Sequence, residues 1–484
     1  MPRRQSMPSS RGPSGRRRWF RAALLACCAV VIAAQASHVC GQFGGGFRGG
    51  GLGGGPFGGG GFGLNPVGGI AIDTAGVVRT VDEKALDESV RAMRAAVAAT
   101  KLPARGGENR TVSLAGIMAA VKKAVEDGVP IPVDVVLLGG LERITHVFVV
   151  PEDHDILLMG PADLPVVDAF GTPVGKRSGR PLLRLEDLVV ALRSADQSRA
   201  GGVFCSIDPT PHGIARLQEF LAAQKTMGRN PATVFRGMEE ALGPQTVTVG
   251  GVPGDSRFAR VLVAADHMMK RIGMGHEPSG IKELPSYLTL VRPGGRASSM
   301  PRFWLEAEYE PLARDADELT WQIRGRRMKC LSAAGPAAGD GIRRGVGPPD
   351  ESLDAWCLAM TEHYDRLTAR HPVFAELINC VDLAVVAAII RSRQLDARAG
   401  LDLSGLTADR LLALPKYEVA KTVPTAANGL KKGQTWVLSA SGGVLLRPWQ
   451  FATNARPDAG LDQARAATRA ARPAGPPASA CWWD

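Results

Sequence analysis

The chain has 484 residues, enough for two or three domains, and a hydrophobic fraction of 45% that is typical of globular proteins. Its net charge of +11 does not indicate nucleic-acid binding, because seven arginines and no acidic residue lie within residues 1–36. Without them the net charge falls to +4, and the densest remaining basic cluster, Arg324 to Lys329, is typical of a solvated strand edge. We therefore predict no nucleic-acid partner.

The N-terminus has the composition of an export signal. A basic stretch ending at Arg18 precedes about fifteen mostly apolar residues, and Ala34-Gln35-Ala36 provides the small residues that signal peptidase requires. We predict a signal peptide over residues 1–36, with cleavage between Ala36 and Gly41. The apolar run is shorter than the about 20 residues of a membrane helix, so no membrane span is expected after cleavage. An uncleaved N-terminal anchor is the alternative.

Two segments have compositions typical of disorder. Glycine occupies 15 of the 23 positions in residues 41–63. Such a chain buries too little surface to offset its backbone entropy, so residues 37–65 are predicted to be a flexible, glycine-rich tether. Residues 452–484 are rich in Ala, Arg and Pro and are predicted to be a disordered tail.

Residues 66–200 are predicted to form an N-terminal α+β domain. Hydrophobic periodicity and turn residues predict the following elements: hairpins over 69–78 and 142–160, and helices over 82–99, 113–128 and 184–195. Asp153, His154 and Asp155 lie together at the tip of the second hairpin. Because three adjacent side chains cannot converge on one ion, we interpret them as a solvated loop rather than a metal site.

A second domain is predicted over residues 201–451, and it begins with the sequence VFCSIDPTPHG (203–213). This stretch is typical of a strand that turns into a helix, with Thr210 as the N-cap and Pro211 at the first helical position. It also contains Ser206, Asp208 and His212. Catalytic triads are assembled from separate segments, so this short cluster favours a local structural role.

The rest of this domain is predicted to alternate between helices and strands. The expected elements are helices over 230–243, 253–275, 352–371 and 372–394, three strands within 302–334, and final strands within 434–451. The helix over 372–394 is apolar almost all round, which is typical of a central core helix. The fold class predicted is therefore α+β, with mixed hairpins and helices around one buried apolar helix.

Three stretches carry a resemblance to a known family: VFCSIDPTPHG, GVPGDSRFARVLVAADHMMKRIGMG and HPVFAELINCVDLAVVAAIIR, behind an export signal and a glycine-rich leader. Together they resemble a planctomycete family of secreted proteins catalogued as domain of unknown function 1598. The resemblance covers most of residues 65–450. It implies export and one globular unit, and it implies no activity, because no catalytic or ligand-binding residues are assigned to that family.

Isolated motif matches do not indicate a known enzyme. Ser256 lies in a Gly-Asp-Ser sequence, but that esterase chemistry also needs an Asp-x-x-His pair, which the chain lacks. Ser279 and Lys282 match S-x-x-K without the Lys-Thr-Gly strand that accompanies it in penicillin-binding enzymes. We predict no cofactor and no metal site.

The cysteines are scattered along the chain. One or two pairs could form disulfides in an oxidising compartment, whereas Cys205 and Cys380 are expected to be buried thiols.

One candidate polar cluster remains. Glu376, Asn379 and Asp382 follow one another at i, i+3 and i+6 on the apolar helix. Buried carboxylates require partners, so either arginines and backbone groups pair with them or they line a polar pocket. Asp208 and His212 complete this candidate set.

The most economical hypothesis is a non-enzymatic secreted or envelope-associated protein that works by binding or assembly, with other envelope proteins or glycans as partners. One alternative is a secreted hydrolase in which Asp208, His212 or Asp382 converges with His363. Another is a carbohydrate-binding protein that uses exposed indoles, for which the candidates are Trp304, Trp321, Trp436 and Trp449.

Overall fold

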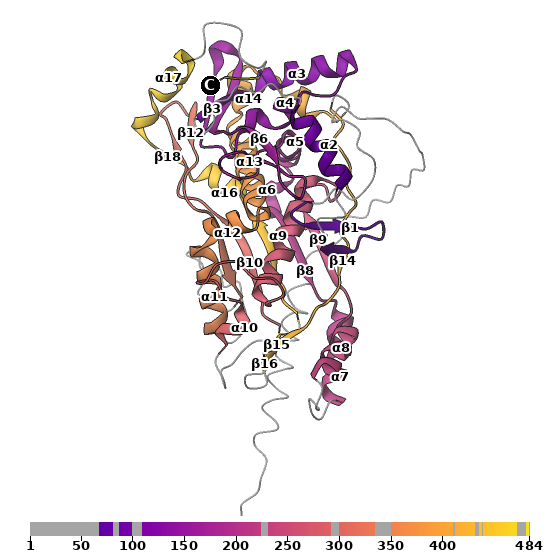
Figure 1. Cartoon of the computed structure of the whole chain (residues 1–484). Helices are drawn as coiled ribbons and strands as arrows, with labels where there is room; N and C mark the ends of the chain where they lie inside the picture. Colours follow the sequence, from indigo (N-terminus) through magenta and orange to yellow (C-terminus); the bar gives the residue numbers. More distant parts are fainter. Residues whose placement is uncertain are drawn as a thin grey trace, which may run out of the picture.

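The computed structural model describes the following residues: 67–80, 87–98, 109–223, 231–291, 300–333, 350–409, 412–430, 435–437, 439–471 and 481–483. The predicted signal peptide and tether lie outside these residues. The part of the chain that is described has an α+β fold, in which two larger sheets and several helices surround a long central helix (Figure 1).

One larger sheet has the strand order β18-β11-β12-β4-β5-β3-β19 within the described residues. Its strands are β3 (Asn109–Ser113), β4 (His146–Val150), β5 (Asp155–Pro161), β11 (Ala313–Arg314), β12 (Thr320–Gln322), β18 (Arg456–Pro457) and β19 (Trp482–Trp483). The hairpin predicted over 142–160 is confirmed as β4 and β5, which pair in antiparallel register and turn at His154. Because β4 also pairs with β12, the two predicted domains share this sheet.

The other larger sheet has the order β13-β10-β17-β8-β9-β14, again within the described residues. Its strands are β8 (Val203–Asp208), β9 (Gln245–Gly250), β10 (Phe303–Glu308), β13 (Arg327–Ser332), β14 (Thr422–Val423) and β17 (Gly443–Leu446). The strands predicted within 302–334 are present, but β12 leaves this sheet for the other one while β10 and β13 pair with each other. Both sheets therefore draw strands from this segment.

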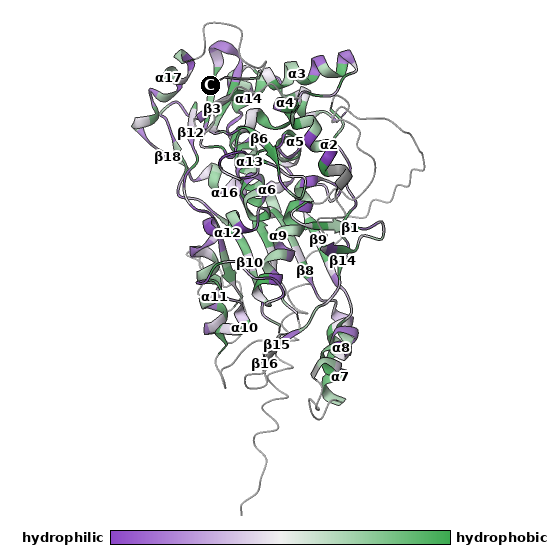
Figure 2. Cartoon of the chain, in the orientation of Figure 1, coloured by the Kyte–Doolittle hydropathy of each residue, from purple (hydrophilic) through white to green (hydrophobic). Residues whose placement is uncertain are grey.

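Helix α13 (Val373–Arg393) lies at the centre of the fold, as predicted. Every side chain from Val373 to Ile390 is buried, and α13 packs against α5 (Leu185–Ser194), α9 (Arg257–Gly273) and α16 (Pro448–Thr453). Among the described helices only α13 is long and apolar enough to cross a membrane by composition, but here it is enclosed by the protein. Figure 2 shows hydrophobic residues along these interior elements and polar residues on the peripheral α3 (Leu114–Asp127).

The remaining elements cover this core. Apart from α3, α5, α9, α13, α16 and a pair of helices between β8 and β9, the described helices are α2 (Asp87–Ala98), α4 (Val133–Val136), α6 (Ser198–Gly201), α10 (Tyr287–Leu290), α11 (Glu351–Glu362), α12 (Tyr364–Arg370), α14 (Leu395–Ala399), α15 (Ser404–Thr407) and α17 (Ala464–Ala470), with 3-10 turns at Leu138–Gly140, Pro151–Asp153 and Ala459–Leu461. Small hairpins are formed by β1 (Ile70–Ile72) with β2 (Val78–Thr80), β6 (Pro165–Val167) with β7 (Pro173–Gly175), and β15 (Asn428–Leu430) with β16 (Thr435–Val437). The helix predicted over 352–371 is divided into α11 and α12 at His363.

Helices α7 (Pro211–Ala223) and α8 (Pro231–Leu242) form a pair between β8 and β9. The helix start predicted at Pro211 is confirmed, since the Thr210 hydroxyl accepts a hydrogen bond from the Gly213 amide at 2.9 Å. The pair projects from the end of the body opposite α3 (Figure 1). Its buried residues form a small cluster separate from the main core: Leu217, Val234, Met238 and Leu242.

The prediction of a disordered C-terminal tail is corrected for residues 452–471 and 481–483. Arg469 of α17 forms an ion pair with Asp153 at 2.9 Å, and Arg465 forms one with Glu152 at 3.5 Å. The strand β19 pairs with β3, and Cys481 is fully buried. Two arginines of the predicted tail therefore bind acidic residues at the β4–β5 turn.

Candidate functional site

Glu376 lies in a buried ionic cluster centred on Arg257, in the first turn of α9. The guanidinium of Arg257 donates to Glu376 on α13 and to Asp187 on α5, and its Nε lies 3.8 Å from an oxygen of Glu186. The side chains of all four residues are at most 10% exposed. Three helices are thus joined through one arginine.

Burial and opposing charge determine the protonation of this cluster. Burial raises the pKa values of Glu376 and Glu186, while Arg257 and Arg184 oppose that shift. Burial alone would lower the pKa of Arg257, but Asp187 and the two glutamates raise it well above its ordinary value. Three carboxylates therefore surround the guanidinium of Arg257 away from solvent, and the cluster holds α5, α9 and α13 together as an internal ion-pair network.

Asn379 and Asp382 have separate partners. The amide of Asn379 donates to the carbonyl of Pro181 at 2.9 Å, ahead of α5. Asp382 Oδ1 accepts hydrogen bonds from the Tyr309 hydroxyl at 2.7 Å and from Arg327 Nε at 3.2 Å. Burial raises the pKa of Asp382, and Arg327 and Tyr309 oppose that effect. Of the two interpretations left open by the sequence, these contacts match the structural one, in which arginines and backbone groups pair with the polar residues of α13.

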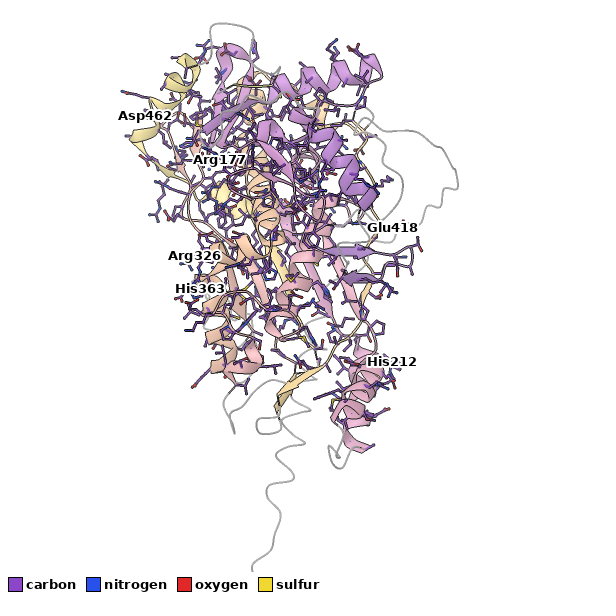
Figure 3. The ribbon with its side chains drawn as sticks, viewed as in Figure 1. Arg177, His212, Arg326, His363, Glu418 and Asp462 are labelled. Atoms are coloured by element: carbon purple, nitrogen blue, oxygen red, sulfur yellow. The ribbon has the colours of Figure 1, made fainter. Side chains whose placement is uncertain are left out.

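Asp208 and His212 lie away from these residues. Asp208 is half-buried at the end of β8, where Oδ1 accepts a hydrogen bond from the Gly442 amide at 3.2 Å. His212 is exposed in the first turn of α7. Figure 3 shows His212 on the projecting helix pair and His363 on the opposite side of the molecule. The structure therefore does not bring the histidines and carboxylates of the hydrolase alternative into one site.

Helix α9 carries a buried ion pair. Asp266 and Lys270 are spaced i, i+4 and pair at 3.0 Å, and both side chains are buried. Lys270 also donates to the carbonyls of Ile207 at 2.7 Å and Gly442 at 3.1 Å, which ties α9 to β8 and to the turn before β17. The sequence could not reveal that strands from distant segments cover this side of the helix.

The ionisable groups of this region have altered pKa values. Burial raises the pKa of Asp266 to about 7, and Lys270 opposes that effect. Burial lowers the pKa of the neighbouring His267 to about 4, and Arg271 and Lys270 contribute to the lowering. Both side chains therefore favour their neutral forms in the folded protein more strongly than in water.

A surface cavity of about 430 Å³ lies between α5, α13, α14 and α15. Four of its charged side chains bind one another: Arg193 pairs with Asp409 at 2.6 Å and Arg391 with Asp196 at 2.8 Å. Arg193 also donates to the Leu406 carbonyl at 3.0 Å, so its guanidinium braces α15 against α5. These groups are occupied by internal contacts.

The residues of the weaker motif matches also have local roles. Ser256 caps α9 by accepting a hydrogen bond from the Ala259 amide at 3.1 Å. Ser279 donates to the Leu284 carbonyl at 2.6 Å. Asp155 is buried and binds the Ala115 amide at 2.9 Å, whereas Asp153 binds Arg469. Within the described residues, no group of three His, Cys, Asp or Glu side chains is placed to hold a metal ion.

The tryptophans do not form a flat sugar-binding platform among the described side chains. Trp321 is fully buried and donates to the Glu318 carbonyl at 2.9 Å. The indole of Trp449 donates to the Ala195 carbonyl at 2.7 Å and is covered by a guanidinium, that of Arg199, 5.0 Å from its centroid. Trp304 is partly exposed, and the side chain of Trp436 lies outside the described part.

Two of the cysteines have the state that the sequence predicts: Cys205 and Cys380 are buried free thiols.

Residues 205–287 match the model of a family described as a protein of unknown function, DUF1598. This segment runs from β8 through the α7–α8 pair, β9 and α9 to the start of α10. The match supports the predicted family over this segment. No curated protein and no solved structure matches the chain.

Proposed function

We propose that this protein is an exported, non-enzymatic component of the cell envelope or surrounding medium, that it works by binding or assembly, and that it belongs to a planctomycete family of exported proteins. One observation carries the non-enzymatic part: the strongest candidate residues, Glu376, Asn379 and Asp382, are all bonded to groups inside the core. A catalytic site needs groups that converge where substrate can reach them. The export part is supported by the sequence of residues 1–36.

Cell fractionation followed by intact-mass analysis tests export. We expect the protein in the envelope or medium, with a mass that corresponds to cleavage between Ala36 and Gly41. A matched control replaces the small residues of the cleavage site, as in the double variant Ala34→Arg, Ala36→Arg, and should accumulate as the uncleaved precursor. Recovery of the full-length wild-type chain from the cytosol would overturn the proposal.

A separate assay tests the non-enzymatic part. The purified protein is incubated with chromogenic ester, glycoside and peptide substrates beside the variants His212→Ala and His363→Ala, which remove the two histidines of the hydrolase alternative. We expect no turnover above the buffer rate for any of the three proteins. Hydrolysis by the wild type that either substitution abolishes would establish the hydrolase alternative instead.

A further inference from the structure

Strand β13 and helix α11 place two cysteines against each other. Cys330 lies in β13 and Cys357 in α11, and both are 4% exposed free thiols. Around them, the Ser332 hydroxyl donates to Asp354, and the Thr361 hydroxyl accepts a hydrogen bond from the Cys330 amide at 2.8 Å. The strand and the helix are therefore joined on both sides of Cys357.

The periodicity of the two elements makes the cysteine side chains meet. Asp354, Cys357 and Thr361 are spaced i, i+3 and i+7, so they share one face of α11. Cys330 and Ser332 are two residues apart and point to the same face of the strand. The Thr361 hydroxyl also donates to the Cys357 carbonyl at 2.8 Å, so one oxygen touches the backbone of both cysteines.

The Cys330 thiol is also close enough to Cys357 to change its ionisation. A hydrogen bond with the Cys330 thiol, together with burial, raises the pKa of Cys357 well above its ordinary value. A protonated, buried thiol is a poor nucleophile, so these residues react slowly with an external disulfide while they stay buried. A disulfide needs two thiols that adjoin in this way, and here they lie between two elements that are already hydrogen-bonded to each other.

We propose that Cys330 and Cys357 are a site of oxidative modification and form a disulfide that links β13 to α11. The reaction is thiol–disulfide exchange with a small-molecule or protein disulfide as oxidant. The S–S bond of the oxidant breaks and one S–S bond forms between the cysteines. The oxidant leaves as two thiols, which take up the two protons that the cysteines lose. The proposal does not require export, although oxidising compartments are where such bonds persist.

Peptide mapping tests the link. The purified full chain is equilibrated in buffers of increasing oxidised-to-reduced glutathione ratio, its remaining thiols are alkylated, and it is digested with trypsin. Cleavage after lysine and arginine places Cys330 in the peptide 330–343 and Cys357 in the peptide 345–366. We expect these peptides to be joined at oxidising ratios, to appear about 2 Da below the sum of their free masses, and to separate on reduction.

Two cysteine variants and a repeat of the oxidation in urea serve as controls for the peptide mapping. The Cys357→Ser variant should lose the joined peptide, whereas Cys205→Ala, which removes a buried thiol of β8, should retain it. Oxidation should raise the thermal midpoint of the wild type by several degrees and leave that of Cys357→Ser unchanged. The glutathione equilibration is repeated in urea just below the unfolding transition, where the oxidant reaches buried thiols, before alkylation and digestion. Recovery of the two cysteines only as separate alkylated or glutathionylated peptides in both conditions would overturn the proposal, whatever the fractionation shows.

Discussion

Helix α13 and the α7–α8 pair both contain polar residues between apolar ones, but the protein covers them differently. The polar residues Glu376, Asn379 and Asp382 of α13 are buried and bonded to distant elements. The α7–α8 pair packs around its own small cluster and leaves His212 exposed. The difference shows that a polar residue in a helix indicates neither a site nor a surface until the elements that cover the helix are known.

The largest expected effect comes from breaking the ionic cluster of α13. In Arg257→Leu, the carboxylates of Glu186, Asp187 and Glu376 stay buried without their common cation, so the free energy of unfolding should fall by about 3–5 kcal/mol. Urea denaturation at pH 7 measures it. The matched control Arg391→Leu removes the exposed pair with Asp196 and should cost less than about 1 kcal/mol. Equal losses in the two variants would show that the buried network contributes no more to the free energy of unfolding than an exposed ion pair does.

A smaller loss is expected at the other buried carboxylate of α13. Asp382→Ala leaves Arg327 and the Tyr309 hydroxyl without their shared acceptor and should cost about 3 kcal/mol. Asp382→Asn keeps an oxygen that can accept both hydrogen bonds, so it should lose about half as much. Thermal and urea unfolding of the two variants should therefore rank them, with Asp382→Asn closer to the wild type. The reverse order would contradict the assigned contacts.

The sequence predicted the elements that depend on local patterns. The apolar run of α13, the Ser113 cap of α3 with its left-handed Gly128 end, and the hairpin of β4 and β5 all follow from neighbouring residues. The sequence also indicated that the carboxylates of α13 need partners. These features are encoded within about twenty residues, which is the range that periodicity and capping rules cover.

The identity of those partners could not be predicted, because it depends on distant contacts. Arg257 reaches Glu376 across 119 positions and Asp187 across 70. Residues 452–471 likewise depend on acidic residues of the β4–β5 turn, because Arg469 reaches Asp153 across 316 positions and Arg465 pairs with Glu152. No local rule indicates such pairs, so the sequence indicates that these carboxylates need partners but not which residues supply them.

The pH dependence of stability tests the buried side of α9. The pKa of Asp266 is about 7 in the folded protein and 3.8 without the fold, so the folded state binds more protons between these values. The contribution of Asp266 to stability therefore falls as pH rises from about 4 to 7. The variant Asp266→Asn lacks this titration. Measured by urea unfolding, its free energy of unfolding relative to that of the wild type should therefore rise by about 2 kcal/mol from pH 5 to pH 7.

His267 provides the opposite control for this pH prediction. Its pKa is about 4 in the folded protein and 6.5 without the fold, so it contributes stability that is gained as pH rises through this window. His267→Asn should therefore make the fall between pH 5 and pH 7 steeper. If Asp266→Asn and His267→Asn changed the slope in the same direction, the assigned protonation states would be contradicted.

The smallest effect is expected from removing the α7–α8 pair. Asp208 of β8 pairs with Thr246 of β9, so the two strands end side by side and a short Asn-Gly turn can replace residues 209–244. The separate cluster around Leu217 is lost, together with the hydrogen bonds that Thr425 and Ala427 donate to Gly243 and Glu239. The main core keeps its contacts, so the main transition in urea should shift by less than about 1 kcal/mol. The full chain should, in addition, lose its α7–α8 amide protection before the core in hydrogen exchange. A loss as large as that of Arg257→Leu would show that the pair folds as one unit with α13, and the contrast between the two regions would disappear.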